Sequence, residues 1–465
     1  MNRQIMEELV EIVGSDYLLT DGQQVSSYLY DQVEVPLRPK ASRHSIVVKP
    51  ASTEEVSAIV SLASQENIPV VVRGGGTGLC GAATPVYDSI IISMERMNHI
   101  LEIDEKNMMA VMEAGVTLAD LLEELEGHEG IGFPVHPGDE GAQMGGMVST
   151  NAGGARAVRH GIMRNHIKGI KVVLADGSVL SLGGKLLKDN AGYNLMHLII
   201  GSEGTLAIIT EVTLRIYPEE KYTASIVASF DTIEEASSAV LDVVKSGVSP
   251  LAVEYQDKKL NLETAELLGL HWPVKEGSAD LIIILSEKTE TALYDNCRAI
   301  DQICDRHHAR EAMFAGTKQE EADVLAIRSG SYDVIKDDIY HSFDMAVPPS
   351  SMPEFLGELW RLVDSYDTRT NITAHIADGN VHNDILLVDG KVPDYHRELQ
   401  EKMYQLCFSY HGTITGEHGI GKLRVGDLPL QKSPREMELM EQIKKVFDPK
   451  CILNPGTVLR SQREE

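Results

Sequence analysis

The chain has 465 residues, of which 43% are hydrophobic and 24% are charged, as in an ordinary globular protein. Its formal net charge of −28 argues against a nucleic-acid backbone or an anionic membrane surface as the main partner. A chain of this length can bury large cores, so we expect two or more domains. No apolar run approaches the roughly 18 residues of a membrane-spanning helix, and no apolar signal core follows Met1.

The cysteines are scattered and none forms a C-x-x-C pair. This pattern predicts a reducing compartment and argues against an iron–sulfur cluster held by this chain. We therefore expect a cytoplasmic protein, with peripheral attachment to a membrane through a partner as the alternative. The five residues are Cys80, Cys297, Cys304, Cys407 and Cys451.

The first third of the chain predicts a small β-α-β unit that leads into a glycine-rich loop. Ser45–Lys49 and Pro69–Val72 have strand-like sequences, and a capping box at Ser52–Glu55 starts the helix between them. The loop Arg73–Gly81 contains a formal G-x-G-x-x-G. A strand at Ser89–Ser93 follows it instead of a helix, so a Rossmann fold is disfavoured.

The glycines of this loop still favour an anion-binding role over a flexible turn. Residues without a Cβ let several backbone N–H groups converge on a phosphate. A second small-residue stretch, Gly141–Gly161, follows the irregular segment Phe133–Asp139, and we expect it to be irregular as well. A hairpin is predicted at Lys171–Leu182, and a long strand is expected to end at Pro218.

Near residue 220 the pattern changes to alternating strands and helices, which predicts a separate α+β domain with a mostly antiparallel sheet. We expect strands at Tyr222–Phe230, Leu251–Tyr255, Leu281–Ser286 and Tyr340–Val347. Helices are expected at Asp231–Lys245 and from after Ser286 to about His308. Further helices are expected near Thr317–Arg328, Ser350–Tyr366, Asp394–Tyr410 and Ser433–Phe447.

The stretch Thr373–Asp384 predicts a β-hairpin with Asp378-Gly379 as a two-residue turn. This register places His375 directly opposite His382 on one face. The other face is apolar apart from Asn383 and should be core.

Two histidines on one strand pair can bind a divalent metal if a carboxylate joins them. Glu417 in a glycine-flanked loop is the candidate, and zinc is expected, with Mn²⁺ or Fe²⁺ as alternatives. Whether Glu417 reaches the histidines stays open at this stage. The adjacent His418 suits a general base near pH 7. Arg328, expected at the end of a helix, could clamp a carboxylate, although a surface ion pair is the default for such a residue.

Taken together, these motifs make the chain resemble the vanillyl-alcohol-oxidase-type superfamily of flavoproteins, which has a PCMH-type FAD-binding fold. The resemblance is to the branch of D-lactate dehydrogenases, glycolate oxidase flavin subunits and D-2-hydroxyglutarate dehydrogenases. It spans about residues 20–460 and rests on six motifs in order: Arg73–Cys80, Pro137-Gly138 with Gly145–Gly154, Gly201–Thr210, His375–His382, Gly416–Gly421 and Asn454–Gly456.

The resemblance implies an α+β fold with a two-lobed FAD-binding domain over residues 1–220. A substrate domain carrying the metal would span 221–424, and 425–465 would return to the FAD domain. The loop Arg73, Gly74, Gly75, Gly76, Thr77, Gly78 and Leu79 would hold the pyrophosphate. The remaining FAD contacts would be Pro137, Gly138, Asp139, Gly145, Gly146, Ser149, Asn151, Gly153, Gly154, Glu203, Gly204, Ile209 and Asn454.

FAD is expected to be non-covalent, because the loop contains no histidine, with Cys80 as the alternative tether. The resemblance implies a metal on His375, His382 and Glu417 that binds a small D-2-hydroxy acid. His418 would take the hydroxyl proton while hydride leaves C2 for the flavin, and Arg328 would hold the carboxylate. The product would be a 2-oxo acid. Asn380 and Asp384 could orient the ligands from behind.

Departures from the family pattern bear on the substrate. Ala377 replaces a common glycine, and Asp384 stands where 2-hydroxyglutarate enzymes tend to have asparagine. The region Tyr340–Asp344 lacks their lysine for a distal carboxylate, although His341 could partly substitute. D-lactate is therefore expected first, glycolate next, and D-2-hydroxyglutarate is the alternative.

Other classes stay open. A non-catalytic flavin subunit of an electron-transfer complex would not need the histidines, and a zinc hydrolase would not need the glycine loops. An oxidase would use O₂ directly. Otherwise a separate acceptor must take the electrons: a quinone, a cytochrome, an iron–sulfur subunit or an electron-transferring flavoprotein.

Overall fold

The computed structural model describes residues 2–366, 368 and 370–461. The chain divides into two compact units. The first unit contains residues 1–153, 162–218 and 418–465, and the second contains 154–161 and 219–417. The predicted boundary at 220 lies close to the observed one, but the chain returns to the first unit at His418 rather than at 425. The backbone N–H groups of Ile420 and Gly421 donate to Glu203 of the first unit, which explains the earlier return.

The N-terminal sheet of the first unit has the order β1-β2-β4-β3, with β2 and β3 parallel to β4. The predicted β-α-β unit is confirmed as β2 (Ile46–Val48), α3 (Thr53–Gln65) and β3 (Val70–Arg73). The Ser52 side chain caps α3 by accepting from the Glu55 N–H. The glycine loop runs from β3 to β4 (Ile90–Ser93) without a helix, as expected. Before this unit come α1 (Arg3–Val13), β1 (Leu18–Leu19) and α2 (Gly22–Ser26).

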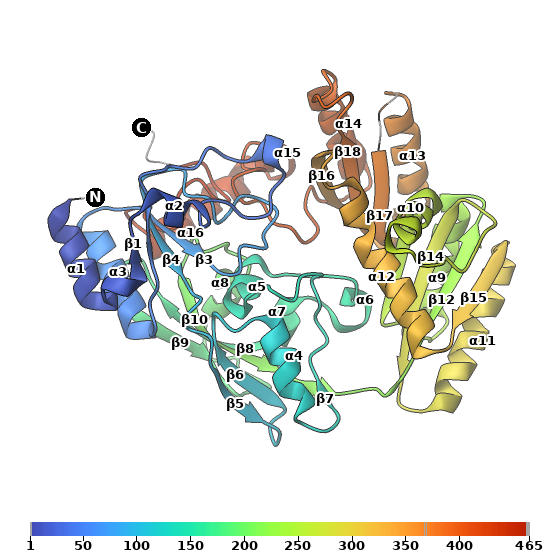
Figure 1. Cartoon of the computed structure of the whole chain (residues 1–465), viewed down its shortest axis with the longest axis horizontal. Helices are drawn as coiled ribbons and strands as arrows, with labels where there is room; N and C mark the ends of the chain where they lie inside the picture. Colours follow the sequence, from blue (N-terminus) through green and yellow to red (C-terminus); the bar gives the residue numbers. More distant parts are fainter. Residues whose placement is uncertain (1, 367, 369, 462–465) are drawn as a thin grey trace. The chain divides into compact units, whose positions relative to one another are not determined.

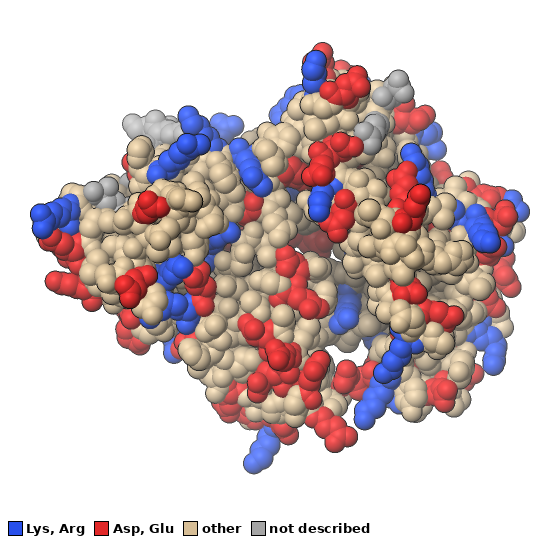
Figure 2. Space-filling view, viewed as in Figure 1, with Lys and Arg blue, Asp and Glu red and all other residues tan. Residues whose placement is uncertain are grey.

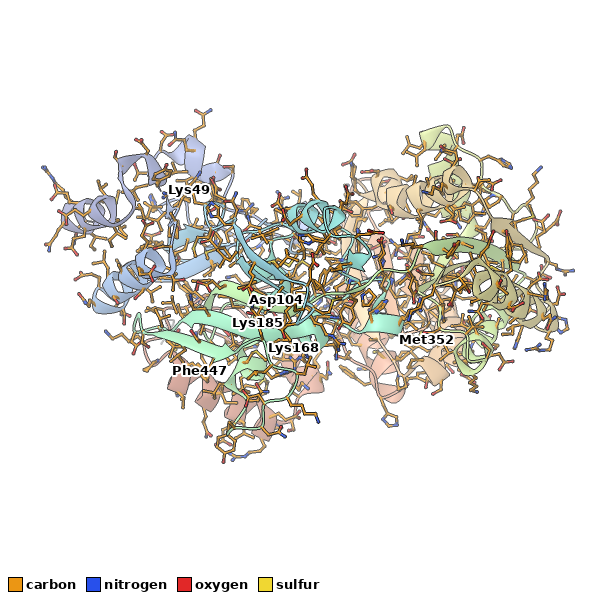
Figure 3. All side chains as sticks on the ribbon, turned by 90° about the horizontal axis from the view of Figure 1, so that it is seen from below. Lys49, Asp104, Lys168, Lys185, Met352 and Phe447 are labelled. Carbon is orange, nitrogen blue, oxygen red and sulfur yellow. The ribbon has the colours of Figure 1, made fainter. Side chains whose placement is uncertain are left out.

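The second sheet of the first unit is antiparallel, with the order β5-β6-β10-β8-β9. The predicted hairpin is β8 (Ile167–Val173) with β9 (Val179–Gly183). Just after β9, the Lys185 ammonium lies 2.7 Å from the carboxylate of Asp104 on the opposite edge strand, β5 (Figure 3). The other strands are β5 (Ile100–Asp104), β6 (Met109–Glu113) and β10 (Ile208–Arg215).

The small-residue stretch is partly helical, contrary to the expectation of irregular structure. It contains α5 (Met144–Thr150), α6 (Ala157–His160) and α7 (Met163–His166). A Cβ on Gly145 would lie 2.6 Å from the Ala114 Cβ, so the glycine lets α5 approach the neighbouring chain. Tight packing, rather than irregular backbone, explains this glycine.

The C-terminal segment packs back into the first unit. Helix α16 (Pro434–Phe447) lies where a helix was predicted and starts at a Ser433 capping box, and Leu453 forms a parallel bridge with Val70 of β3. The unit is completed by α4 (Leu118–Glu126), β7 (Ile131–Gly132), α8 (Leu195–Ile199), β11 (Tyr217–Pro218) and α15 (Leu428–Gln431).

The second unit is built on a seven-stranded antiparallel sheet with the order β15-β12-β14-β13-β17-β18-β16 (Figure 1). The predicted strands are confirmed to within a few residues, and β15 was not predicted. The strands are β12 (Tyr222–Phe230), β13 (Ala252–Asp257), β14 (Ala279–Glu287), β15 (Glu311–Ala315), β16 (Ile339–Ala346), β17 (Thr370–His375) and β18 (Asn380–Leu386).

Helices cover the two faces of this sheet differently. On one face, α10 (Lys258–Leu268) and α12 (Lys318–Ile335) pack on β12 and β13, where Val324 and Ile327 join Val227 and Ile282 in an apolar core. The opposite face carries α9 (Ile233–Lys245), α11 (Glu290–Arg306), α13 (Met352–Asp364) and α14 (His396–Ser409). The helix at 258–268 was not predicted, and α12 extends seven residues beyond its expected end.

In the face drawn in Figure 2, acidic side chains are spread over the surface with basic ones interspersed, in keeping with the net charge of −28. Within the residues that the structure describes, no helix is long and apolar enough to cross a membrane.

Candidate active site

The predicted hairpin exists, but its register is wrong by two residues. His375 pairs with Asn380, and Thr373 pairs with His382. The loop has four residues, Ile376–Gly379, rather than the two of the Asp-Gly turn. Because the shift is even, both histidines stay on one face as diagonal neighbours. Their ring centroids are 5.3 Å apart.

Glu417 joins this histidine pair. Its Oε1 lies 3.3 Å from Nε2 of His375 and 3.3 Å from Nε2 of His382. The three potential ligand atoms lie within 4.8 Å of one another, and all three residues are largely buried. Two imidazoles whose Nε2 atoms converge on one carboxylate suit a divalent cation with an open coordination position. The donor set and its geometry therefore fit the metal that the sequence implies.

A buried carboxylate lies behind His375. Glu254 on β13 pairs with His375 across the sheet, and its Oε1 lies 2.7 Å from Nδ1 of His375. Its other oxygen accepts two hydrogen bonds from Arg328, with Nε at 2.9 Å. Burial opposes charge on Glu254, but His375 and Arg328 outweigh burial and lower its pKa to about 2.

The pKa values of the ligands shift in opposite directions. Burial alone would lower the pKa of His375, but the charges of Glu254 and Glu417 raise it well above 6.5. Burial alone would raise the pKa of Glu417, but His375 and His382 lower it well below its usual value. Without a cation the cluster therefore holds a proton that a metal would have to displace.

A second buried carboxylate, Asp344 on β16, holds the loop that carries Glu417. Its Oδ2 accepts from the Thr415 hydroxyl at 2.6 Å and from the Glu417 N–H at 3.0 Å. Asn380 donates to its other oxygen at 2.8 Å. Asp344 thus bonds both the loop that carries Glu417 and the hairpin that carries the histidines, and these hydrogen bonds bring Glu417 to the histidines.

Arg328 lies in the middle of α12, not at the end of a helix as predicted. Its Nε and Nη2 are bonded to Glu254, and its side chain is 30% exposed. Nη1 has no hydrogen-bond partner among the residues that the structure describes. The guanidinium is therefore anchored on one side and keeps donors on the other.

His418 is the first residue of the first unit after Glu417, the last of the second. The proposed base therefore directly follows a proposed ligand in the chain. The carbonyl of His418 lies 3.2 Å from the Cys80 Sγ, and Cys80 is buried. The thiol is also 2.6 Å from Nη1 of Arg424, which is buried as well.

The glycine loop of the first unit arches over the Arg73 side chain. Gly76 has φ +74°, and a Cβ there would lie 2.2 Å from Nη2 of Arg73. The guanidinium donates to the Tyr30 carbonyl at 2.8 Å, so the charge supports the loop from beneath. A Cβ on Gly75 would meet the Gly141 carbonyl at 2.4 Å.

Other glycines of the predicted cofactor set border open space. No heavy atom lies within 4 Å of a Cβ built on Gly138 or Gly146. A Cβ built on Gly74 would lie 3.8 Å from the Cα of Gly146. Backbone exposed in this way can be approached by a flat or phosphorylated ligand, so the cradle fits FAD. Asp31 lies beside it, with its carboxylate buried and 3.4 Å from the Cβ position of Gly78.

A second group from the predicted cofactor set is tied together by protein contacts. Asn454 donates to the Glu203 carbonyl at 2.8 Å and accepts from Lys422 at 2.8 Å. Lys422 also donates to Ala82 and Thr457, and burial lowers its pKa to about 7. Glu203 bonds the Gly419–Gly421 turn through both carboxylate oxygens, as described above.

The remaining predicted cofactor residues are spread over the first unit and its border. Asp139 accepts from Gln32 and Gly141, and the Asn151 side chain accepts from the Arg164 N–H. Ile209 is buried in the core of the second sheet. Gly153 ends a segment of the first unit, whereas Gly154 begins the inserted segment of the second.

His341 does not lie on the face that carries the histidine pair. Asp344 pairs with His382 and Ser342 with Asp384, so Ser342 and Asp344 of β16 share the face of the cluster. His341 stacks on Phe343 and lies 3.1 Å from His396 of α14 on the other face. The suggestion that His341 replaces a substrate-binding lysine is therefore wrong, because the pleat directs it away. Asn380 and Asp384 share the face of His375, as predicted.

Sequence reasoning missed Glu254, Asp344 and Lys422. The first two are single acidic residues inside apolar strands, Leu251–Tyr255 and Tyr340–Val347. An acid in a strand that is otherwise apolar is expensive to bury unless it has a partner. That pattern was the available signal, although it does not identify the partner.

Comparison with known proteins identifies the family of the chain. Residues 219–458 match the model for FAD linked oxidases, C-terminal domain, and residues 44–183 match an FAD binding domain. A D-lactate dehydrogenase of Archaeoglobus fulgidus is 38% identical, covering 93% of this chain and 96% of its own. A glycolate oxidase subunit of Bacillus subtilis is 30% identical, covering 98% of this chain and 97% of its own.

Solved structures with the same fold include 4-ethylphenol oxidase from Gulosibacter chungangensis, with a TM-score of 0.77 and 19% identity. That alignment covers 99% of this chain and 98% of the oxidase. p-Cresol methylhydroxylase has a TM-score of 0.76 at 16% identity, covering 98% and 96% of the two chains. The expected two-domain α+β fold is thus confirmed. The chain belongs to the FAD-linked oxidases, and it is an FAD-dependent oxidoreductase of the D-lactate dehydrogenase and glycolate oxidase type.

Proposed function

We propose that the protein oxidises a small D-2-hydroxy acid to the 2-oxo acid with non-covalent FAD and a divalent metal. D-lactate is the first candidate and glycolate the second. The observation that supports this most is the convergence of His375, His382 and Glu417 within 4.8 Å in a chain of the FAD-linked oxidase family. A flavin dehydrogenase of aromatic or apolar substrates would have no use for three buried ligands.

Each protein group has a distinct task in this proposal. FAD, when bound, supplies the two-electron acceptor, and a divalent cation, when bound, lowers the pKa of a substrate hydroxyl. Arg328 binds the substrate carboxylate through its uncommitted Nη1 side while Glu254 holds the other side. His418 accepts the hydroxyl proton at an imidazole nitrogen.

The face around the cluster supports a small substrate. The strand β16 presents Ser342 and Asp344 on that face, and Tyr340–Asp344 contains no lysine for a second carboxylate. His341 points to α14 instead. D-2-hydroxyglutarate, which carries such a carboxylate, is therefore the less favoured substrate.

The electrons then pass from the flavin to a separate acceptor. The five cysteines are unpaired by disulfides and are scattered along the sequence. We propose a quinone or an electron-carrying protein, such as an electron-transferring flavoprotein or an iron–sulfur subunit. In the second case the chain would act as the flavin subunit of a larger complex.

Stopped-flow reduction of the flavin under anaerobic conditions tests the proposal. The purified protein is mixed with D-lactate, L-lactate, glycolate and D-2-hydroxyglutarate, before and after treatment with a chelator. We expect the flavin absorbance to bleach fastest with D-lactate, and chelation to suppress bleaching until a divalent metal is restored. Bleaching that is indifferent to chelation contradicts the metal, and faster bleaching by D-2-hydroxyglutarate contradicts the substrate.

A further inference from the structure

We propose that Glu254 is a positioning residue that aligns the metal ligand His375 and the anion-binding Arg328 at the same time. This inference rests on the proposed function, because it assigns how the two halves of that site are held together. No sequence motif marked Glu254, which lies 121 residues before His375. It acts through its neighbours and not on the substrate.

The sheet itself brings Glu254 to His375. Strands β13 and β17 pair antiparallel, and the register sets the two residues directly opposite each other. Oε1 lies 2.7 Å from Nδ1, and Glu254 is 2% exposed. An ionised carboxylate only accepts hydrogen bonds, so Nδ1 must carry the proton. The ring is then fixed in the tautomer whose Nε2 faces Glu417 with a lone pair for a metal.

The other carboxylate oxygen serves Arg328. Oε2 accepts from both Nε and Nη2 of the guanidinium, which arrives from α12 on the same face of the sheet. A guanidinium is planar, so fixing Nε and Nη2 also fixes the direction of Nη1. One carboxylate thus uses one oxygen for each partner, and the relative position of His375 and Arg328 depends on it.

Neither close substitute can keep both contacts. Glutamine has one carbonyl oxygen and one NH₂ group, so an amide donor must face either Nδ1–H or the guanidinium. Aspartate keeps the charge but is one methylene shorter, so it cannot reach both partners from the same backbone position. The inference therefore predicts a joint defect in metal affinity and in substrate binding from a residue that touches neither.

Metal affinity of the flavin-loaded protein gives a readout that is independent of turnover. Chelator-stripped protein is titrated with Zn²⁺ against a chromophoric chelator, and with Co²⁺ for its absorption bands. For Glu254→Gln we expect Zn²⁺ affinity to fall about 10- to 100-fold, as is typical when the partner of a metal-binding histidine is removed. The Co²⁺ bands should shift as the His375 ring is released. Glu254→Asp should give an intermediate loss.

Two control variants separate positioning from packing. Gln256 lies on the same strand and face, is equally buried at 2% exposure, and pairs with Thr373 rather than with a ligand. Gln256→Ala should leave Zn²⁺ affinity and the Co²⁺ bands unchanged. Arg328→Gln should raise the KM for D-lactate but also leave Zn²⁺ affinity unchanged. The double variant of Glu254 and Arg328 should raise KM by less than the product of the two single effects, because both changes break one unit.

Each outcome decides the inference. It is overturned if Glu254→Gln binds Zn²⁺ as tightly as the unsubstituted protein, or if Gln256→Ala loses as much affinity. If Glu254→Gln does not fold, as judged by flavin retention and circular dichroism, Glu254→Asp decides by the same two criteria. An unsubstituted protein that binds neither Zn²⁺ nor Co²⁺ instead overturns the metal in the proposed function, so the two failures are distinguishable.

Discussion

The two sites of this protein are built from different parts of the polypeptide. The cradle of the first unit is mainly backbone, contributed by glycines in the contiguous loop Arg73–Gly78 and by Gly138 and Gly146. The site of the second unit consists of side chains from separate strands, a loop and a helix. A backbone site is vulnerable to any added Cβ, whereas a side-chain site is vulnerable only at its donors and their supports.

Electrostatics separates the two sites as well. The cradle has the Arg73 guanidinium beneath it, in a chain of net charge −28. The second site gathers the carboxylates of Glu254, Asp344 and Glu417 around two histidines. The first therefore favours an anion and the second a cation. Variants should damage one site without the other, and the following predictions test this separation.

The largest effect is expected for His382→Ala. Loss of one metal ligand should slow flavin reduction by D-lactate about 10³-fold, because metal assistance is worth several kcal/mol. Flavin content should not change. The control Thr373→Val alters the cross-strand partner of His382 without removing a proposed metal ligand, and its flavin should be reduced at close to the original rate. Anaerobic stopped-flow spectroscopy measures both, and normal reduction in the histidine variant would exclude the metal.

The next largest effect is expected for Gly76→Ala, which should damage only the first site. A Cβ there meets the Arg73 guanidinium at 2.2 Å and the residue has φ +74°, so either the loop must move or the guanidinium must leave the Tyr30 carbonyl. We expect loss of flavin on desalting and a lower thermal midpoint. Gly130→Ala is matched in φ, at +72°, but nothing lies within 4 Å of its Cβ. It should cost only about 1 kcal/mol and keep its flavin. Equal flavin retention in the two variants would contradict the cradle.

A smaller effect is expected for Arg328→Lys. An ammonium cannot hold Glu254 and a substrate carboxylate in one planar fork, so the KM for D-lactate should rise about 10-fold. Steady-state kinetics with an artificial electron acceptor measures this. Zn²⁺ affinity should stay the same, and a parallel loss of metal would mean that Arg328 supports the ligands rather than the substrate.

The smallest effect concerns pH. The pKa of His375 in the folded, metal-free protein is raised above 6.5 by Glu254 and Glu417, so its protonation stabilises the fold below pH 6.5. This contribution is lost as the pH rises through the raised value. A metal competes with that proton, so Zn²⁺ affinity should rise by up to about tenfold per pH unit below it. Zn²⁺ titrations from pH 6 to 8 measure the slope, and a flat profile would argue against His375 as a ligand.

Much of the fold could be predicted from local sequence. The strand Tyr222–Phe230, the helix capped at Ser52 and the helix expected at Ser433–Phe447 appear where the sequence predicted them. Helix α5 was missed because glycine lowers helix propensity, and the packing of Gly145 on Ala114 outweighs that cost. Local propensity carries no information about such a contact.

The sequence suggested which residues form the candidate site, but not the turn and the helix position that place them. The Asp-Gly pair suggested a two-residue turn, whereas the loop has four residues, with Gly379 bonded to Val347 and Asn380, just after the loop, bonded to Asp344. Arg328 was expected at a helix end, whereas α12 continues to Ile335. The partners that decide these points lie tens of residues away in the chain.

By itself, the sequence determined which chemical groups this protein has to work with: glycines for an anion cradle, two histidines, a Glu417-His418 pair and no clustered cysteines. It also determined that both histidines share a face, because shifting the strand register by an even number of residues leaves every side chain on the same face of the sheet. Only the tertiary structure decided that Glu254 supports His375, that Asp344 brings in Glu417 and that His341 faces away. Those relations depend on strand order and register, which follow from burying whole sheet faces and not from any local pattern.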